Sequence, residues 1–363
     1  MVTSPTTYDP ELVLKVNELF HDIQNAHYDK IHPEIMNDEV RRWDQTAARL
    51  LGGGRGPVRM LDIGSGTGFV GLRFGAVLRA EDHLTCADLS AKMLGVCEGK
   101  LRGAGLRCDM EFRKLDGRTI GRDGDRFDVI TMNSVLHHLP QVEETLRELD
   151  GLLAPGGVLV IAHEPNRIFA DSFFMRANQN IFRGVQKGWG GCRWRMRAAA
   201  GALLRAVGLR KRKQEGAVAP PVSLSEALAD DQVLDDAKVH VLINERLVKE
   251  GVLQRPLTLE ELFAITDLHD HRDGESHKVG FGFDMFELTR RVLPRMKVET
   301  FESYNHLSFL TETTAGSRRY AAMLQRIFPR HGATFFAVLR KNPAPVAASR
   351  ESVAAQPSAM GVA

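Results

Sequence analysis

The stretch Leu61-Asp62-Ile63-Gly64-Ser65-Gly66-Thr67-Gly68-Phe69 decides the fold of this chain. A β-prone apolar run, Val58 to Ile63, ends in this stretch and a helical pattern follows, so the glycines lie at a strand-to-helix turn. Glycine lets the backbone turn tightly there and lets a ligand come closer than a Cβ would allow. The spacing is G-x-G-x-G, whereas the dinucleotide fingerprint G-x-G-x-x-G would need glycine in place of Phe69. This difference counts against a nicotinamide cofactor.

Strand-like runs alternate with helical patterns after this turn. Further strands are expected at His83 to Ala87, Met110 to Lys114, Phe127 to Met132 and Val158 to Ala162, and two late runs, Lys297 to Phe301 and Thr334 to Leu339, are expected to complete the sheet. The helix before the fifth strand is expected to end at Pro155-Gly156-Gly157. Such alternation is typical of parallel strands with crossover helices. The sequence therefore predicts an α/β fold with a doubly wound, seven-stranded, mostly parallel sheet of the Rossmann-like kind.

The length of 363 residues exceeds what a single core usually holds, so a core with a large elaboration is expected. Residues 1–52 form an N-terminal helical segment that ends at a run of three glycines. Residues 53–165 and 293–341 form the α/β core, and residues 166–292, where the strand-helix alternation lapses, form a mainly helical cap over the acceptor. Residues 342–363 are rich in Pro, Ala and Ser and are expected to be a disordered tail.

Composition limits the class of partner. The formal net charge is only +2, which does not indicate a nucleic acid. The four cysteines show no paired spacing, so neither a zinc site nor a disulfide framework is expected, and a reducing cytoplasm fits best. The most apolar run, Leu152 to Ala162, is broken by Pro155, so no membrane span is expected.

Two acidic residues close the second and third expected strands. Asp88 and Asp116 each come at the carboxyl end of a strand, where ligands bind in doubly wound sheets. A carboxylate at the first position can accept hydrogen bonds from both ribose hydroxyls, and one at the second can accept from an adenine amino group. Together with the glycine turn they are ordered as one nucleoside pocket. The alternative is that the glycines only make a tight turn and the aspartates only cap helices.

The glycine turn and the two strand-end aspartates resemble the small-molecule type of the class I S-adenosylmethionine-dependent methyltransferase family. Two further segments share in the resemblance, Val135-Leu136-His137-His138-Leu139-Pro140 and Leu153-Ala154-Pro155-Gly156-Gly157. The likeness covers Val58 to Glu164 and, more weakly, Lys297 to Arg340. It implies S-adenosyl-L-methionine as the cofactor and an N-terminal Tyr or His, within Tyr28 to Pro33, that closes over it. The implied cofactor-binding residues are Asp62, Gly64, Ser65, Gly66 and Gly68 for the methionine part, Asp88 for the ribose, Leu89, Met93, Asp116 and Gly117 for the adenosine, and Asn133 and Ser134 beside the sulfonium.

Candidate bases follow the fourth and fifth strands. Methyl transfer needs a base only where the nucleophile must lose a proton, and His137, His138, His163 and Glu164 are expected at the ligand-binding edge. The alternatives are a helix-start histidine and a buried, hydrogen-bonded polar pair. His271, from a later loop, is a further candidate base. The D/N-P-P-Y/F pattern of nitrogen methylation is absent after the fourth strand, so oxygen and carbon acceptors are favoured.

Two segments of the expected cap carry their own hypotheses. From Arg193 to Lys213 an apolar stripe accompanies a basic face, as in interfacial helices, which would suit an anionic membrane surface or a prenyl diphosphate. A solvated helix packed on the core is the alternative. The run His269 to His277 is dense in metal-capable side chains, but their closeness in sequence favours a polar loop, so a divalent metal is left open and no metal ligand is assigned.

The sequence therefore predicts a methyltransferase that acts on carbon or oxygen of a small, partly apolar acceptor, either a specialised metabolite or a lipid or prenyl compound. One alternative is a non-catalytic module that binds S-adenosylmethionine and docks on RNA or a protein partner through its basic cap. A nicotinamide oxidoreductase is the third, disfavoured by Phe69. The oligomeric state stays open.

Overall fold

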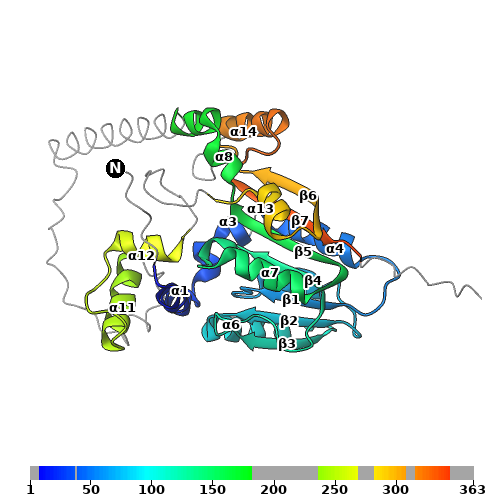
Figure 1. Ribbon diagram of the computed structural model, residues 1–363, viewed down its shortest axis with the longest axis horizontal. Helices are drawn as coiled ribbons and strands as arrows, with labels where there is room; N and C mark the ends of the chain where they lie inside the picture. Colours follow the sequence, from blue (N-terminus) through cyan, green and yellow to red (C-terminus); the bar gives the residue numbers. More distant parts are fainter. Residues whose placement is uncertain (1–7, 37–38, 182–235, 269–281, 308–314, 344–363) are drawn as a thin grey trace, which may run out of the picture.

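The computed structural model describes residues 8–36, 39–181, 236–268, 282–307 and 315–343, and they form one central sheet with helices around it (Figure 1). The sheet has seven strands in the order β3-β2-β1-β4-β5-β7-β6. The strands are β1 (Arg59–Ile63), β2 (His83–Asp88), β3 (Asp109–Lys114), β4 (Phe127–Asn133), β5 (Leu153–Pro165), β6 (Met296–Tyr304) and β7 (Thr334–Lys341). Strands β1 to β5 pair in parallel, and β7 runs antiparallel to both β5 and β6. The predicted seven-stranded, mostly parallel sheet is confirmed.

One strand boundary differs from the prediction. Helix α7 (Val142–Leu152) ends one residue before β5 begins, whereas the sequence placed the helix end at Pro155 and the strand start at Val158. Leu153 already pairs with Phe127 of β4, and the left-handed Gly156, at φ 78°, lies within the strand. The prediction was wrong because a buried leucine fits the helical period as well as it fits a strand.

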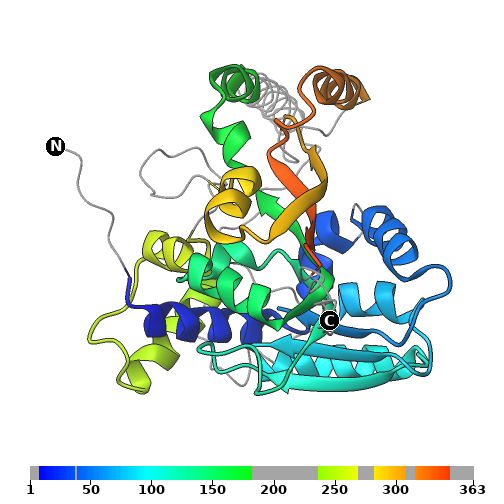
Figure 2. The ribbon, with the colours of Figure 1, turned by 45° about the vertical axis from the view of Figure 1, so that its right-hand side comes forward.

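The helices form a layer on each face of the sheet (Figures 1 and 2). One layer holds α4 (Val40–Leu51), α5 (Phe69–Gly75) and α6 (Ala91–Gly103), which bury Trp43, Phe74 and Leu101 against the sheet. The other layer holds α7 and α13 (Met285–Val292), which bury Leu149 and Met285. Parallel strands with both faces covered are buried throughout, which explains the continuous apolar runs of β1, β4 and β5.

Three further helices form a group beside the sheet. Helix α1 (Pro10–Gln24) starts at Asp9, whose side chain accepts a hydrogen bond from the Glu11 amide at 3.0 Å. It packs through Val13 and Val16 against α11 (Asp236–Lys249) and α12 (Leu259–Thr266), and α12 begins with a capping box. The short helices α2 (Tyr28–Ile31) and α3 (Pro33–Met36) connect α1 to α4 (Figure 2). Within the expected cap, residues 236–268 are thus largely helical.

Helices α8 (Arg167–Asp171) and α14 (Ala315–Ile327) pack together through a small apolar cluster that includes Phe169 and Leu324. No helix within the described ranges is long and apolar enough to cross a membrane. The three cysteines of those ranges, Cys86, Cys97 and Cys108, are buried and free. The basic segment Arg193 to Lys213, the run His269 to His277 and residues 344–363 lie outside the described residues, and the proposed division into domains stays a prediction.

Candidate active site

The glycine turn lies at the carboxyl end of β1 and is held in a left-handed conformation. Gly64, Gly66 and Gly68 have φ of 60°, 51° and 88°. A Cβ on Gly64 would lie 2.3 Å from Cγ2 of Val135, and one on Gly68 would lie 2.6 Å from Cδ1 of Leu101. Gly64 therefore lets the β4 loop approach, whereas Gly68 lets α5 pack on α6.

Asp88 connects the end of β2 to this turn. Its Oδ2 accepts a hydrogen bond from the Gly66 amide and its Oδ1 accepts one from the Ser90 amide, both at 2.8 Å. The side chain is almost wholly buried, and this burial raises the pKa of Asp88 above its ordinary value. The carboxylate thus lies in place to meet a ligand seated on the glycine turn.

A cavity extends from the glycine turn across the carboxyl ends of the strands. Of the predicted cofactor residues it is lined by Gly64, Gly66, Asp88, Leu89, Gly117, Asn133 and Ser134, whereas Asp62, Ser65, Gly68, Met93 and Asp116 do not line it. Apolar walls come from Ile63, Leu115 and Leu139. The cavity therefore combines a carboxylate, exposed backbone and apolar surface, as a nucleoside requires.

Two of the predicted residues that do not line the cavity, Asp116 and Met93, have structural contacts elsewhere. Asp116 is exposed, and its Oδ1 accepts hydrogen bonds from the Arg118 amide at 2.8 Å and the Thr119 amide at 3.1 Å, which lower its pKa. Met93 is buried behind the cavity wall with 1% of its surface exposed. Asp116 thus caps its own turn and Met93 packs in the interior, whereas the predicted contact of each with the adenosine stays a prediction.

Asp62 lies under the glycine turn at the end of β1. Its Oδ1 accepts a hydrogen bond from the Thr131 hydroxyl at 2.7 Å on the neighbouring strand β4. Burial raises the pKa of Asp62 to about 7, since desolvation outweighs the stabilising hydrogen bonds. This carboxyl therefore links β1 to the neighbouring strand β4.

An N-terminal wall closes the cavity, and the sequence did not predict most of it. Helix α1 contributes Leu14, Asn17 and His21, and Tyr28 follows from α2. His21 Nδ1 lies 2.8 Å from the Asn17 carbonyl oxygen, and burial lowers the pKa of His21. The sequence feature that could have indicated this wall is the pair of polar residues Asn17 and His21, spaced one helical turn apart among apolar residues of one helix. Tyr28 lies where the resemblance placed a closing side chain, and its role toward the cofactor stays a prediction.

Glu164, a predicted base, is bonded on both oxygens. Its Oε1 accepts hydrogen bonds from the amides of Val135 at 2.7 Å and Leu136 at 2.6 Å. Its Oε2 lies 3.1 Å from the His137 amide and 2.8 Å from His137 Nδ1, which donates to it. Glu164 is fully buried and does not line the cavity, so its geometry favours holding η1 (Leu136–His138) in place over the predicted catalytic role.

The remaining candidate bases lie apart. His138 lines the cavity, its Nδ1 contacts the Thr266 carbonyl, and its ring meets the His21 ring edge-on at 5.4 Å. His163 does not line this cavity but a neighbouring one, and His271 lies outside the described residues. His137, His138 and Asp267 offer ligand atoms within 4.8 Å of one another, a different set from the run His269 to His277 for which the sequence left a divalent metal open.

Residues 61–159 match the family model described as a methyltransferase domain. The chain is 31% identical over 156 residues to the ubiquinone/menaquinone biosynthesis C-methyltransferase UbiE of Vibrio campbellii, which covers 43% of this chain and 60% of that protein. It is 31% identical over 147 residues to UbiE of Azotobacter vinelandii, covering 40% and 57%. Among solved structures, magnesium protoporphyrin IX methyltransferase of Synechocystis is 18% identical, with a TM-score of 0.37 over 45% of this chain and 80% of that one. The chain thus spans less than two thirds of the curated relatives it matches.

These matches, the sheet order and the cavity identify a class I S-adenosylmethionine-dependent methyltransferase domain in this chain. S-adenosylmethionine is the cofactor of this domain, and the cavity suits it. The Asp88 carboxylate can accept from ribose hydroxyls, and the left-handed glycines leave room for the methionine part.

Proposed function

We propose that this chain transfers the methyl group of S-adenosylmethionine to a carbon or oxygen atom of a small, partly apolar acceptor. The observation that carries the proposal is the cavity that joins the glycine turn, Asp88 and Asn133 under the wall formed by α1. The matched relatives are named as C-methyltransferases of ubiquinone and menaquinone biosynthesis, which favours a biosynthetic role and transfer to carbon.

The residues of the cavity act mainly by alignment. Asp88 would accept from the ribose hydroxyls, Leu89 and Leu115 would pack on the adenine, and Asn133 would flank the reacting methyl group. Bound S-adenosylmethionine supplies an electrophilic methyl carbon. Holding the acceptor in line with it contributes on the order of 7–11 kcal/mol to lowering the barrier. His21 and Tyr28 exclude water from above, which strengthens the electrostatic interactions inside.

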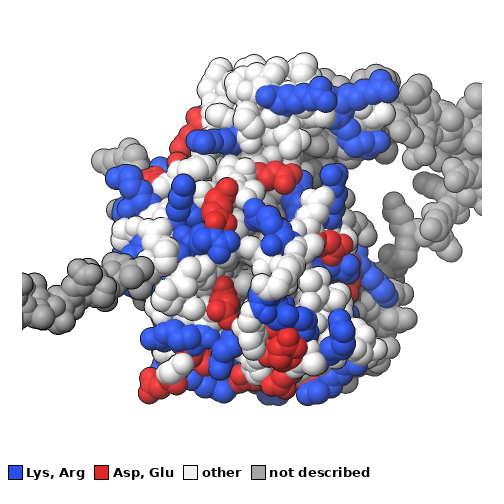
Figure 3. Space-filling view, turned by 90° about the vertical axis from the view of Figure 1, so that its right-hand side faces the viewer, with Lys and Arg blue, Asp and Glu red and all other residues white. Residues whose placement is uncertain are grey.

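The docking-module alternative has no support in the comparisons, since the family match and the named relatives are methyltransferases. On the face shown in Figure 3, basic and acidic side chains are interspersed. Contact between the segment Arg193 to Lys213 and an anionic membrane surface or a prenyl diphosphate stays a prediction, as do the cytoplasmic location, the domain division and the absence of a nucleic acid partner.

Incubation of the full chain with S-adenosylmethionine and a panel of hydroquinones, catechols and enols tests this function. Mass spectrometry should detect one acceptor that gains a single methylene unit of mass, together with S-adenosylhomocysteine in equal amount. The Asp88→Asn variant should form much less product at the same cofactor concentration, because it loses the charge that holds the ribose. Turnover of a nicotinamide instead would contradict the proposal.

A further inference from the structure

Two histidines and an aspartate, the η1–α12 cluster, gather where the sheet meets the helices beside it. His137 and His138 belong to η1, which follows β4, and Asp267 comes directly after the last residue of α12. A ring nitrogen of each histidine and a carboxylate oxygen of Asp267 lie within 4.8 Å of one another. The cluster therefore joins two elements that are far apart in the sequence. Neither the resemblance nor the proposed function assigns it a role.

One carboxylate oxygen of the η1–α12 cluster faces both histidines. Asp267 Oδ1 lies 3.7 Å from His137 Nε2 and 3.7 Å from His138 Nδ1. Both distances are too long for a hydrogen bond. Two atoms bound to one tetrahedral zinc ion lie about 3.4 Å apart, because each bond to the ion is about 2.0–2.2 Å long. The spacing thus fits atoms that share an ion better than atoms that share a proton.

Glu164 fixes the orientation of the His137 ring. His137 Nδ1 lies 2.8 Å from Glu164 Oε2, and both side chains are almost fully buried. Because a carboxylate only accepts hydrogen bonds, Nδ1 carries a proton, and in the neutral ring Nε2 then has its lone pair on the side of Asp267. A histidine that donates its other ring nitrogen to a carboxylate is the usual arrangement at metal sites. His137 is thus oriented as a metal ligand.

Charge at the η1–α12 cluster favours a bound cation. Two carboxylates, those of Glu164 and Asp267, lie at the two nitrogens of the His137 ring. The Glu164 side chain is 0% exposed and that of Asp267 is 17% exposed, so water screens neither charge well. A positive charge between His137 Nε2 and Asp267 would offset both carboxylates. A metal ion or a second proton on the ring could supply that charge, and metal binding distinguishes the two.

His138 connects the η1–α12 cluster to the cofactor cavity. Its side chain lines that cavity, and its ring meets the ring of His21 from α1 edge-on at 5.4 Å. Its Nδ1 also contacts the Thr266 carbonyl. Because one nitrogen cannot donate a proton and coordinate a cation at the same time, a metal ion bound at Nδ1 replaces this contact. An ion here therefore affects the wall of the cofactor cavity.

We propose that His137, His138 and Asp267 bind a divalent first-row transition metal ion, with zinc as the best fit, and that this ion fastens α12 to η1. Two imidazoles and a carboxylate are ligands that zinc takes, whereas magnesium and calcium take oxygen ligands. Helix α12 packs on α1, which supplies His21 to the cofactor cavity, so the ion holds that wall against the sheet. The inference goes beyond the proposed function and does not depend on the acceptor.

The test is a titration of the full chain, dialysed against a chelator, with cobalt(II) as the probe. One equivalent of cobalt should give visible absorption bands that zinc then removes, and either metal should raise the melting temperature. Asp267→Asn and His138→Gln should each weaken cobalt binding at least tenfold and remove the rise in melting temperature. Glu164→Gln should weaken cobalt binding by about 10–100-fold, because it no longer orients the His137 ring. Unchanged far-ultraviolet circular dichroism shows that the variants fold.

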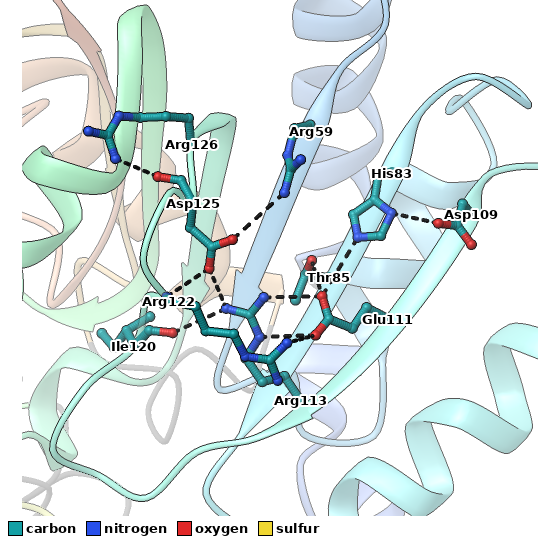
Figure 4. Close-up of polar contacts among 10 residues, drawn as sticks. All are labelled: Arg59, His83, Thr85, Asp109, Glu111, Arg113, Ile120, Arg122, Asp125 and Arg126. Carbon is teal, nitrogen blue, oxygen red and sulfur yellow. Dashed lines mark hydrogen bonds and ion pairs between the residues drawn. The ribbon is translucent and has the colours of Figure 1, made fainter.

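Two control variants localise the metal. His83 also lies between two carboxylates, with Nδ1 2.8 Å from Asp109 Oδ2 and Nε2 3.8 Å from Glu111 Oε2, but on β2 beside β3 (Figure 4). The second control replaces the three histidines of the run His269 to His277 by glutamine. Both His83→Gln and this triple variant should bind cobalt as the parent chain does.

Three results would overturn the inference. They are the absence of cobalt binding by the parent chain, unchanged cobalt binding in Asp267→Asn, and loss of binding in the triple variant alone, which would place the metal on the run His269 to His277. Binding of S-adenosylhomocysteine to the parent chain, measured separately, keeps the proposed function intact in each of these cases.

Discussion

Replacing Asp62 by asparagine should make the stability of the chain less dependent on pH. Asp62 is buried under the glycine turn, and desolvation raises its pKa from 3.8 to about 7. A carboxyl whose folded pKa lies above its unfolded value destabilises the folded state once the pH exceeds the unfolded pKa, and this penalty grows until the pH passes the folded pKa. The penalty is therefore small near pH 4 and complete near pH 8.

The magnitude follows from the size of the shift. A rise of roughly 3 units corresponds to a full penalty of about 4 kcal/mol in the free energy of unfolding, of which about 3 kcal/mol develops between pH 5 and pH 8. Asparagine cannot ionise, and its Oδ1 can still accept from the Thr131 hydroxyl. Between these two pH values the parent chain should therefore lose about 3 kcal/mol more stability than Asp62→Asn does.

Urea unfolding of both chains at the two pH values measures this difference. Other titrating groups that do not contact Asp62, such as His306 and His331, are present in both chains, so their contributions largely cancel in the comparison. Thr131→Val serves as a second variant, because loss of the hydroxyl should raise the pKa of Asp62 further and steepen the pH dependence. The same pH dependence in the parent chain and Asp62→Asn would show that Asp62 does not have a raised pKa in the folded chain.

Three other substitutions have expected outcomes. Glu164→Gln should lower the free energy of unfolding by about 1–3 kcal/mol, because it places an amide against the two N–H donors of His137. In the same thermal melts, the surface control Glu98→Gln should change the stability little. Gly64→Ala should reduce the affinity for S-adenosylhomocysteine at least tenfold, because the added Cβ would overlap Val135. Gly95 has open space around it, so the control Gly95→Ala should leave this affinity unchanged. Tyr28→Ala should weaken the binding of S-adenosylhomocysteine about tenfold, or by about 1.4 kcal/mol, in calorimetry. The control Tyr320→Phe removes a hydroxyl that donates to Asn178, and it should leave this affinity unchanged.

The sheet was predictable from the sequence because local patterns specify it. Strands β1, β4 and β5 read as short, mainly apolar runs, and the glycine turn marks where β1 meets α5. Both late strands were found despite the long interruption, since residues 334–339 are almost wholly apolar and β-prone. The start of β5 was missed because Leu153 fits two periodicities.

The site was predictable only where a motif carried it. Asp88 and Asn133 follow strands, and the ends of parallel strands meet at one edge. Asp116 follows a strand too, but a carboxylate beside Gly117 can equally bond its own turn, which the sequence does not decide. The pairing of Glu39 with His163 joins residues 124 positions apart, and the wall from α1 depends on how α1 packs on α12. No local pattern encodes such contacts.

The ion pairs around β3 show why charge alone did not mark the site. Arg113 bonds Asp125 at 2.7 Å and Glu111 at 3.1 Å, and Arg122 bonds Glu111 at 2.8 Å (Figure 4). The Arg113 guanidinium lowers the pKa of Glu111. These ionisable residues neutralise one another, whereas Asp88 lines the cofactor cavity. In the sequence the two groups look alike.

Calorimetric titration of the purified chain with S-adenosylhomocysteine, beside NADH and repeated on Asp88→Asn, tests the central claim most directly. The parent chain should bind the sulfur nucleoside and not NADH, and the affinity should be weaker by about 1.5–3 kcal/mol in the variant because hydrogen bonds to a charged group are lost. Absence of binding to the parent chain, or equal affinity in Asp88→Asn, would contradict it.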